Sequence, residues 1–136
     1  MALNDRPHGI GHAAAMARKP HKKLCLSFYT ELTNFIGDDE DEFEIIGEWC
    51  IDQNNLESDA PDLVVFRQGE TIACLIVEIT TSKEFKTMIT KVKRLAEEYS
   101  VEEYFVYDYE KYVWYSNHDN DTSYSEILEL NLSDFV

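Results

Sequence analysis

The sequence predicts an α/β protein with three layers, α/β/α, in which helices flank a central mixed β-sheet. The first observation is the order of the expected elements, which runs helix, three strands, helix and two strands. The second is that two strand segments are near-continuous apolar runs, the pattern of strands covered on both faces. The third is that a helix separates the third strand from the fourth, because a helical crossover within one sheet makes the joined strands parallel.

The chain has the size and composition of one domain. Its 136 residues compare with about 100–150 residues in a typical domain, and 44% of them are apolar, so global disorder is not expected. We expect residues 1–20 to form a flexible leader, because they lack periodicity, and residues 21–136 to form the domain. Because no apolar run approaches the roughly 18 residues that span a bilayer, we expect no membrane partner and a cytoplasmic location.

The first half of the chain contains one expected helix and three expected strands. Apolar residues repeat at helical spacing over residues 22–36, and Gly37 follows as a stop signal. The acidic run 38–42 is expected to form a solvated turn. Three strand segments follow, one alternating and two continuously apolar, at residues 43–51, 63–66 and 72–77. The last two predict a central hairpin that turns at Gln68 and Gly69.

The second half adds a helix and further strands. Thr81 and Glu84 have the spacing of a capping box, and apolar residues repeat at helical spacing over residues 85–99. A second hairpin and one last strand are then expected at residues 103–107, 111–115 and 125–130.

Two carboxylates of the central hairpin, Asp62 and Glu78, are expected to meet. The predicted turn places Asp62 opposite residue 76, one diagonal step from Glu78 and on the same face of the sheet. Glu78 follows a continuous apolar run, where an unpaired charge is costly. The position of Glu78 alone supports two interpretations equally. Glu78 is either a metal ligand, or a strand-end carboxylate that is hydrogen-bonded to a helix or paired with a lysine.

Cysteines and histidines do not predict a zinc site. The cysteines are far apart without a CxxC pair and are expected to be buried thiols: Cys25, Cys50 and Cys74. The histidines fall in the leader region or in a polar turn: His8, His12, His21 and His118.

The net charge of −15 argues against non-specific binding along a nucleic-acid backbone. The twelve basic residues are nevertheless concentrated, with five in or beside the leader and five on the second expected helix. The five on that helix are Lys83, Lys86, Lys91, Lys93 and Arg94.

Three blocks of sequence carry a resemblance to a known family. Residues 60–66, 76–80 and 101–108 resemble, in order and spacing, a restriction endonuclease family abundant in cyanobacteria, within the PD-(D/E)xK nuclease superfamily. The similarity covers residues 22–115. It implies a restriction-endonuclease-like three-layer α/β/α fold and hydrolysis of phosphodiester bonds in DNA with Mg²⁺ or Mn²⁺.

The resemblance makes Asp62 and Glu78 metal ligands and the backbone carbonyl of Ile79 a third. Carboxylate oxygens hold Mg²⁺, which lowers the pKa of a bound water and stabilises charge that develops on the phosphate. Glu31 corresponds to a first-helix acid that assists the metal site in some members of the superfamily. The alternative for Glu31 is a glutamate at the rim of the helix.

The lysine of the family motif is displaced in this sequence. The motif places it two residues after the second acid, where this chain has Thr80. In some members the lysine lies on a neighbouring helix, and here Lys91 and Lys93 flank the apolar stripe of the second expected helix. Each has the alternative of a solvated side chain whose stem lies along apolar surface.

Three functions remain open at this point. The first is a Mg²⁺-dependent DNA endonuclease, for which a homodimer would allow cleavage of both strands. The second is a degenerate nuclease fold that serves as a binding or regulatory module, which Thr80 and the strong negative charge favour. The third is an acidic mimic of DNA, which the net charge favours.

Overall fold

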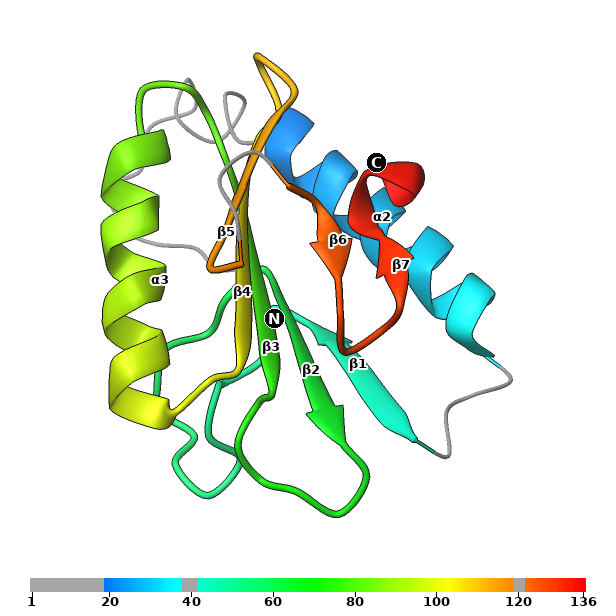
Figure 1. Ribbon diagram of the computed structural model, residues 1–136, viewed down its shortest axis with the longest axis vertical. Coiled ribbons are helices and arrows are strands. Elements are labelled where there is room, and N and C mark those ends of the chain that lie inside the picture. The colour runs from blue at the N-terminus through cyan, green and yellow to red at the C-terminus, as the bar shows by residue number, and fades with distance from the viewer. Residues whose placement is uncertain (1–18, 38–41, 119–121) are drawn as a thin grey trace.

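The computed structural model describes residues 19–37, 42–118 and 122–136. Its main sheet has five strands in the order β1-β2-β3-β4-β5, and Figure 1 shows their arrangement. The strands are β1 Phe43–Gly47, β2 Leu63–Arg67, β3 Leu75–Thr80, β4 Glu103–Asp108 and β5 Val113–Ser116. Neighbouring strands are antiparallel except for β3 and β4, which are parallel. The predicted mixed sheet and the predicted crossover are therefore confirmed.

Two long helices cover the sheet from opposite sides (Figure 1). Helix α2, Lys19–Ile36, lies on one face, and α3, Phe85–Tyr99, lies on the other. A short hairpin of β6, Tyr124–Ser125, and β7, Leu130–Asn131, leads into the 3-10 helix η2, Leu132–Phe135. Leu132 of η2 packs into the same hydrophobic cluster as α2. The chain is thus α/β with helices on both faces of its sheet.

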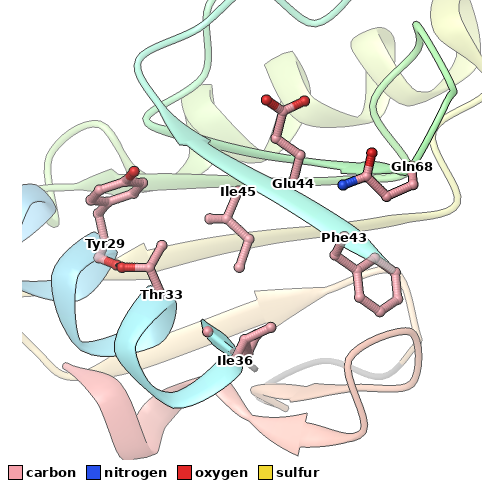
Figure 2. Close-up of a pocket in the computed structure, with 8 residues that line it drawn as sticks. Tyr29, Thr33, Ile36, Phe43, Glu44, Ile45 and Gln68 are labelled. Atoms are coloured by element: carbon pink, nitrogen blue, oxygen red, sulfur yellow. The ribbon is translucent and has the colours of Figure 1, made fainter. Parts of the chain in front are cut away.

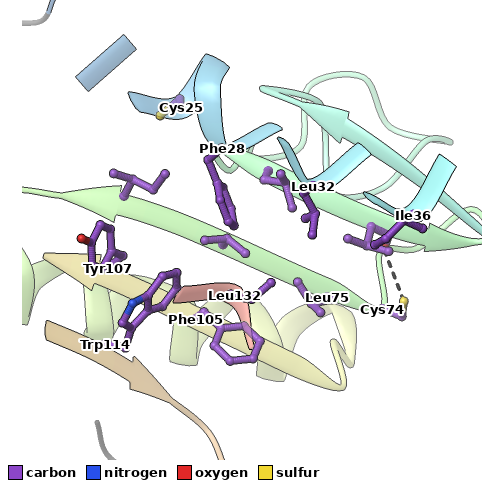
Figure 3. Packing of buried hydrophobic residues seen from close by; sticks show 14 residues of the cluster. Cys25, Phe28, Leu32, Ile36, Cys74, Leu75, Phe105, Tyr107, Trp114 and Leu132 are labelled. Carbon is purple, nitrogen blue, oxygen red and sulfur yellow. Dashed lines mark hydrogen bonds between the residues drawn. The ribbon is translucent and has the colours of Figure 1, made fainter. Parts of the chain in front are cut away.

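The strands separate two hydrophobic clusters because successive side chains point to opposite faces. Leu63 and Val65 face α2, where Phe28 and Leu32 are fully buried (Figure 3). The alternate residues of β2, Val64 and Phe66, face α3 and pack in a cluster with Val92 and Leu95 of that helix. Near-continuous apolar strands are therefore explained by two covered faces, as the sequence predicted.

Two predicted boundaries need correction. Helix α2 begins at Lys19, so the last two residues of the predicted leader, 19 and 20, belong to the helix. Pro20 is tolerated because it lies in the first turn. The strand expected over residues 43–51 ends at Gly47, because Glu48 adopts a left-handed conformation with a φ of 50°. The rest of the predicted leader and most of the predicted acidic turn, residues 1–18 and 38–41, lie outside the described residues.

The predicted capping box does not form. The residue before α3 is Glu84, and no side chain caps the helix there. The carbonyl oxygen of Thr81 instead accepts a hydrogen bond from the Glu84 N–H at 3.2 Å. The neighbouring Ser82 hydroxyl donates to Asp108 Oδ2 at 2.7 Å, which ties the start of α3 to the end of β4.

The last predicted strand, residues 125–130, is a hairpin. Ser125 pairs with Leu130, so the segment folds back on itself. The buried carboxylate of Glu103 accepts hydrogen bonds from the Ser125 hydroxyl at 2.7 Å and from the Glu126 N–H at 2.6 Å. These bonds hold the chain in a turn, and the main sheet gains no sixth strand from the described residues. None of the described helices is both long enough and apolar enough to cross a bilayer.

Candidate functional site

Asp62 and Glu78 lie directly across from each other at one end of the β2–β3 pair. Leu63 pairs with Val77, so the next step of the antiparallel register brings Asp62 opposite Glu78. The sequence predicted a register shifted by two residues, with Asp62 opposite Ile76. The difference arises because β3 begins only at Leu75, so the connection is longer than a tight turn. A shift of two preserves the matching parity of the two positions, but the Asp62 carboxylate contacts His21 of α2 while the Glu78 carboxylate contacts Lys91 of α3.

The Asp62 carboxylate accepts two hydrogen bonds through one oxygen. Oδ2 lies 2.8 Å from the backbone nitrogen of Ile79 and 3.3 Å from His21 Nε2. Burial alone would raise the pKa of Asp62, but the hydrogen bonds from His21 and Ile79 and the charge of His21 lower it. Asp62 is therefore an ionised carboxylate at neutral pH.

Glu78 is the more deeply buried of the two acids, with 4% of its side chain exposed. Its Oε1 accepts a hydrogen bond from the Asp62 N–H at 3.2 Å, and its Oε2 lies 2.7 Å from Lys91 Nζ. Burial, and after it the charge of Asp62, raise the pKa of Glu78 to about 7, although the hydrogen bond and charge of Lys91 oppose the rise. Glu78 therefore titrates near neutral pH.

The two candidate lysines of α3 go to different places. Lys91 reaches across to the sheet and meets Glu78. Lys93 lies two positions further along the helix, a rotation of about 200° around the axis, and its Nζ sits 5.4 Å from the ring centre of Tyr115. Thr80, which has the motif position of the lysine, is buried at the end of β3. The structure thus brings Lys91 to the acidic pair and directs Lys93 to Tyr115.

Glu31 lies away from this cluster. It is exposed on α2, ten residues after His21, which corresponds to roughly 15 Å along a helix axis. The part of α2 that contacts Asp62 is its first turn, through His21. Glu31 therefore fits the alternative of a glutamate at the helix rim.

His21 is a site residue that sequence reasoning assigned to the leader region. Its Nε2 lies 2.8 Å from the carbonyl oxygen of Ile79 and 3.3 Å from Asp62 Oδ2. Because a carbonyl oxygen only accepts hydrogen bonds, Nε2 carries the proton. Hydrogen bonds with Asp62 and Cys25 raise the pKa of His21 to about 10, against the opposing effect of burial. His21 is therefore a half-buried cation that bridges two oxygens.

Cys25 completes the group on α2. Its Sγ lies 3.6 Å from His21 Nε2 and 3.9 Å from Nδ1, one helical turn away along the chain. Burial raises the pKa of the Cys25 thiol, and the hydrogen bond with His21 opposes the change. All three cysteines are free and buried, as predicted. The i, i+4 spacing of His21 and Cys25 is the sequence signal that would have paired them, had the helix been extended to residue 19.

Two pockets open beside these residues. One, of about 270 Å³, is lined by His21 and Asp62 among others, and the second, of about 380 Å³, is lined by Cys25 and Asp62. A third pocket, of about 440 Å³, lies between α2 and β1 (Figure 2). Its lining includes one carboxylate, Glu44, and none of the predicted site residues, so we assign no chemistry to it.

No model of a known protein family and no curated protein matches the chain. Function is therefore inferred from the chemistry of the cluster itself. That cluster combines an ionised carboxylate, a carboxylate that titrates near neutral pH, an ammonium group and an imidazolium. A pocket borders it at His21 and Asp62.

Proposed function

We propose that the chain is a Mg²⁺-dependent DNA endonuclease with a restriction-endonuclease-like fold, whose centre consists of Asp62, Glu78, the Ile79 carbonyl and Lys91. The observation that carries the proposal is the contact of 2.7 Å between Lys91 Nζ and Glu78 Oε2. It brings a lysine from α3 to the acidic pair, which compensates for Thr80 at the usual position of that lysine.

The donor set fits a hard divalent ion. Asp62 Oδ2 and the Ile79 carbonyl oxygen both point at one atom, His21 Nε2, at 3.3 and 2.8 Å. The protonated imidazole thus marks a point where two oxygens converge on positive charge. Oxygen ligands are those that Mg²⁺ prefers. Asp62 and Ile79 would hold the ion after His21 has moved away, and Glu78, the neighbour of Ile79 on β3, would bind it from across Asp62.

Each protein group then has a role in phosphodiester hydrolysis. When bound, Mg²⁺ supplies a water of lowered pKa and stabilises negative charge on the phosphate. Lys91 is oriented by Glu78, and its ammonium group orients the attacking water and offsets phosphate charge. Asp62 is fixed by the Ile79 N–H, so its carboxylate does not have to reorganise during the reaction.

The test is cleavage of supercoiled, linear and single-stranded DNA with Mg²⁺ or Mn²⁺. Asp62→Asn and Lys91→Met should each reduce the rate by about 100-fold or more, the usual cost of losing one preorganised charge. Lys93→Met is the matched control, because it removes a lysine of the same helix that contacts Tyr115, and it should cleave like the wild type. Equal cleavage by wild type and Asp62→Asn, or no cleavage of any substrate by wild type, would refute the proposal.

The second candidate is a degenerate nuclease fold that acts as a binding or regulatory module. The observation that favours it is that both oxygens of Glu78 already have partners, the Asp62 N–H and Lys91. On this alternative the ion pair is structural. Calorimetric titration with Mn²⁺ separates the nuclease from the binding module. The nuclease requires Mn²⁺ binding that Glu78→Gln weakens, whereas the module requires no Mn²⁺ binding.

Sedimentation with and without DNA tests the homodimer that cleavage of both strands would use.

A further inference from the structure

We propose that His21, Cys25 and Asp62 form a binding site for a thiophilic divalent ion of the Zn²⁺ class. Their ligand atoms lie within 4.8 Å of one another. This site is distinct in chemistry from the proposed Mg²⁺ centre, although Asp62 belongs to both and the Ile79 carbonyl oxygen lies beside both. It does not require the chain to be a nuclease.

The ligand types select the metal. The site offers an imidazole nitrogen, a thiol sulfur and a carboxylate oxygen, the three donor types that Zn²⁺ takes in proteins. Mg²⁺ binds oxygen and does not seek sulfur. His21 and Cys25 are four residues apart on α2, so they project from one face of the helix toward Asp62.

The spacing is already close to that of a tetrahedral site. Zn–S and Zn–N bonds of about 2.3 and 2.0 Å at the tetrahedral angle place sulfur and nitrogen about 3.5 Å apart, and nitrogen and oxygen about 3.3 Å apart. Cys25 Sγ lies 3.6 Å from His21 Nε2, and that nitrogen lies 3.3 Å from Asp62 Oδ2. Two of the three ligand separations therefore already match those of a tetrahedral site, and the third, from Cys25 Sγ to an Asp62 oxygen, is at most 4.8 Å.

The surroundings orient the ligands and leave a fourth position. The Ile79 N–H holds Asp62 Oδ2 at 2.8 Å, which is the kind of supporting contact that fixes a ligating carboxylate. The Ile79 carbonyl oxygen, which now receives the Nε2 proton of His21, is close enough to serve as a fourth ligand or to hold a bound water. Metal binding displaces the proton on Nε2 and the proton on Sγ, and both pass to solvent.

An ion has access from the surface. The pocket of about 270 Å³ borders His21 and Asp62, and the pocket of about 380 Å³ borders Cys25 and Asp62. Within the described part of the chain, this is the one group of three such side chains whose ligand atoms come this close. The other two thiols, Cys50 and Cys74, are buried outside it.

The experiment is a titration of chelator-treated, reduced protein with Co²⁺, which takes the same ligands as Zn²⁺ and reports them by absorption. Wild type should give a thiolate-to-cobalt charge-transfer band in the near ultraviolet and the strong visible bands of a tetrahedral site, and Zn²⁺ should abolish both. Cys25→Ser should lose the charge-transfer band. His21→Gln should weaken Co²⁺ binding by at least 10-fold, since even supporting contacts of metal ligands contribute that much.

Two controls make the outcome specific. Cys74→Ser removes another buried thiol, outside the cluster, and should keep the full spectrum. Glu78→Gln should also keep the charge-transfer band, although it weakens Mn²⁺ binding if the proposed nuclease centre is real. Failure of this site and failure of the nuclease are thereby distinguished.

The proposal would be overturned if the wild type showed no thiolate-to-cobalt band, or if Cys25→Ser showed the same band as the wild type. Circular dichroism checks that each variant is folded. If Cys25→Ser does not fold, Asp62→Asn and His21→Gln still decide the matter, because both must weaken Co²⁺ binding while the thiolate band persists at saturating metal. Unchanged affinity in both would reject the site.

Discussion

Lys91 Nζ lies 2.7 Å from Glu78 Oε2, and this ion pair joins α3 to β3, the middle strand of the sheet, while only 4% of the Glu78 side chain is exposed. A buried carboxylate needs such a partner, because an unpaired charge in the interior is costly. The pKa of Glu78, raised by burial to about 7, makes the need for Lys91 depend on pH.

Lys91→Met should therefore destabilise the protein more at pH 8 than at pH 5. At pH 8 the variant leaves a buried charge without its partner, and because Glu78 with a pKa of about 7 can instead take up a proton, the cost in the free energy of unfolding is limited to about 1.4 kcal/mol. At pH 5 Glu78 is protonated, and the cost should fall well below that value. Urea denaturation at both pH values measures the difference. Lys93→Met is the control, and an equal loss of stability at the two pH values would contradict the prediction.

His21 should make stability fall as pH rises above neutral. Its pKa in the folded protein is about 10, above the ordinary 6.5, so the stabilisation is fully present below pH 6.5 and is lost as the pH rises toward 10. The slope should approach 1.4 kcal/mol per pH unit, or roughly one proton released on unfolding.

The window for this measurement is pH 7.5 to 8.5, with a chelator present. Glu78 has largely titrated below it, and the thiols of Cys25 and Cys74, whose pKa values are raised from 9.0, contribute above it. His21→Gln should flatten the dependence of the unfolding free energy on pH. A wild-type slope near zero in this window would show that His21 does not hold its proton in the fold.

Glu103 should be essential for the C-terminal hairpin. Its carboxylate, 1% exposed, accepts hydrogen bonds from Ser125, the Glu126 N–H and His118. Glu103→Ala leaves these donors without their acceptor, and we expect a loss of about 3 kcal/mol. The neighbouring Glu102→Ala is the matched control, because its exposed pair with Arg67 should contribute less than about 1 kcal/mol.

Hydrogen exchange checks the mechanism of this loss. The Glu126 amide should exchange much faster in Glu103→Ala than in the wild type, since its acceptor at 2.6 Å is gone. Equal protection of this amide in both proteins would mean that the hairpin is held by other contacts.

Gly69 should resist substitution more than Gly37. A Cβ at either glycine would meet nothing within 4 Å, so the two do not differ in available space. They differ in backbone conformation, because Gly69 has a φ of 83°, in the left-handed region. Gly69→Ala should therefore cost about 1 kcal/mol through backbone strain alone. Gly37→Ala should be close to neutral. Chemical denaturation measures both, and similar values for the two variants would contradict a conformational role for Gly69.

Local patterns in the sequence determined the layers of this protein and the matching parity of its acidic pair. Periods of 3.6 and 2 depend on neighbouring residues alone, so they predicted α2, α3 and the buried strands. The parity of Asp62 and Glu78 survived a register error of two residues, because only a shift by an odd number moves a side chain to the other face. The parallel β3–β4 pair likewise follows from the helical connection between them.

Tertiary packing decided the remaining contacts of the site. His21 contacts Asp62 and Ile79, which lie 41 and 58 residues away in the chain, and no local pattern encodes such distances. The choice of Lys91 over Lys93 depends on which side of α3 faces the sheet, because two residues change the direction of a side chain by about 200°. Which groups meet at the acidic pair was therefore set by how α2 and α3 dock on opposite faces, a result of the whole core rather than of any one segment.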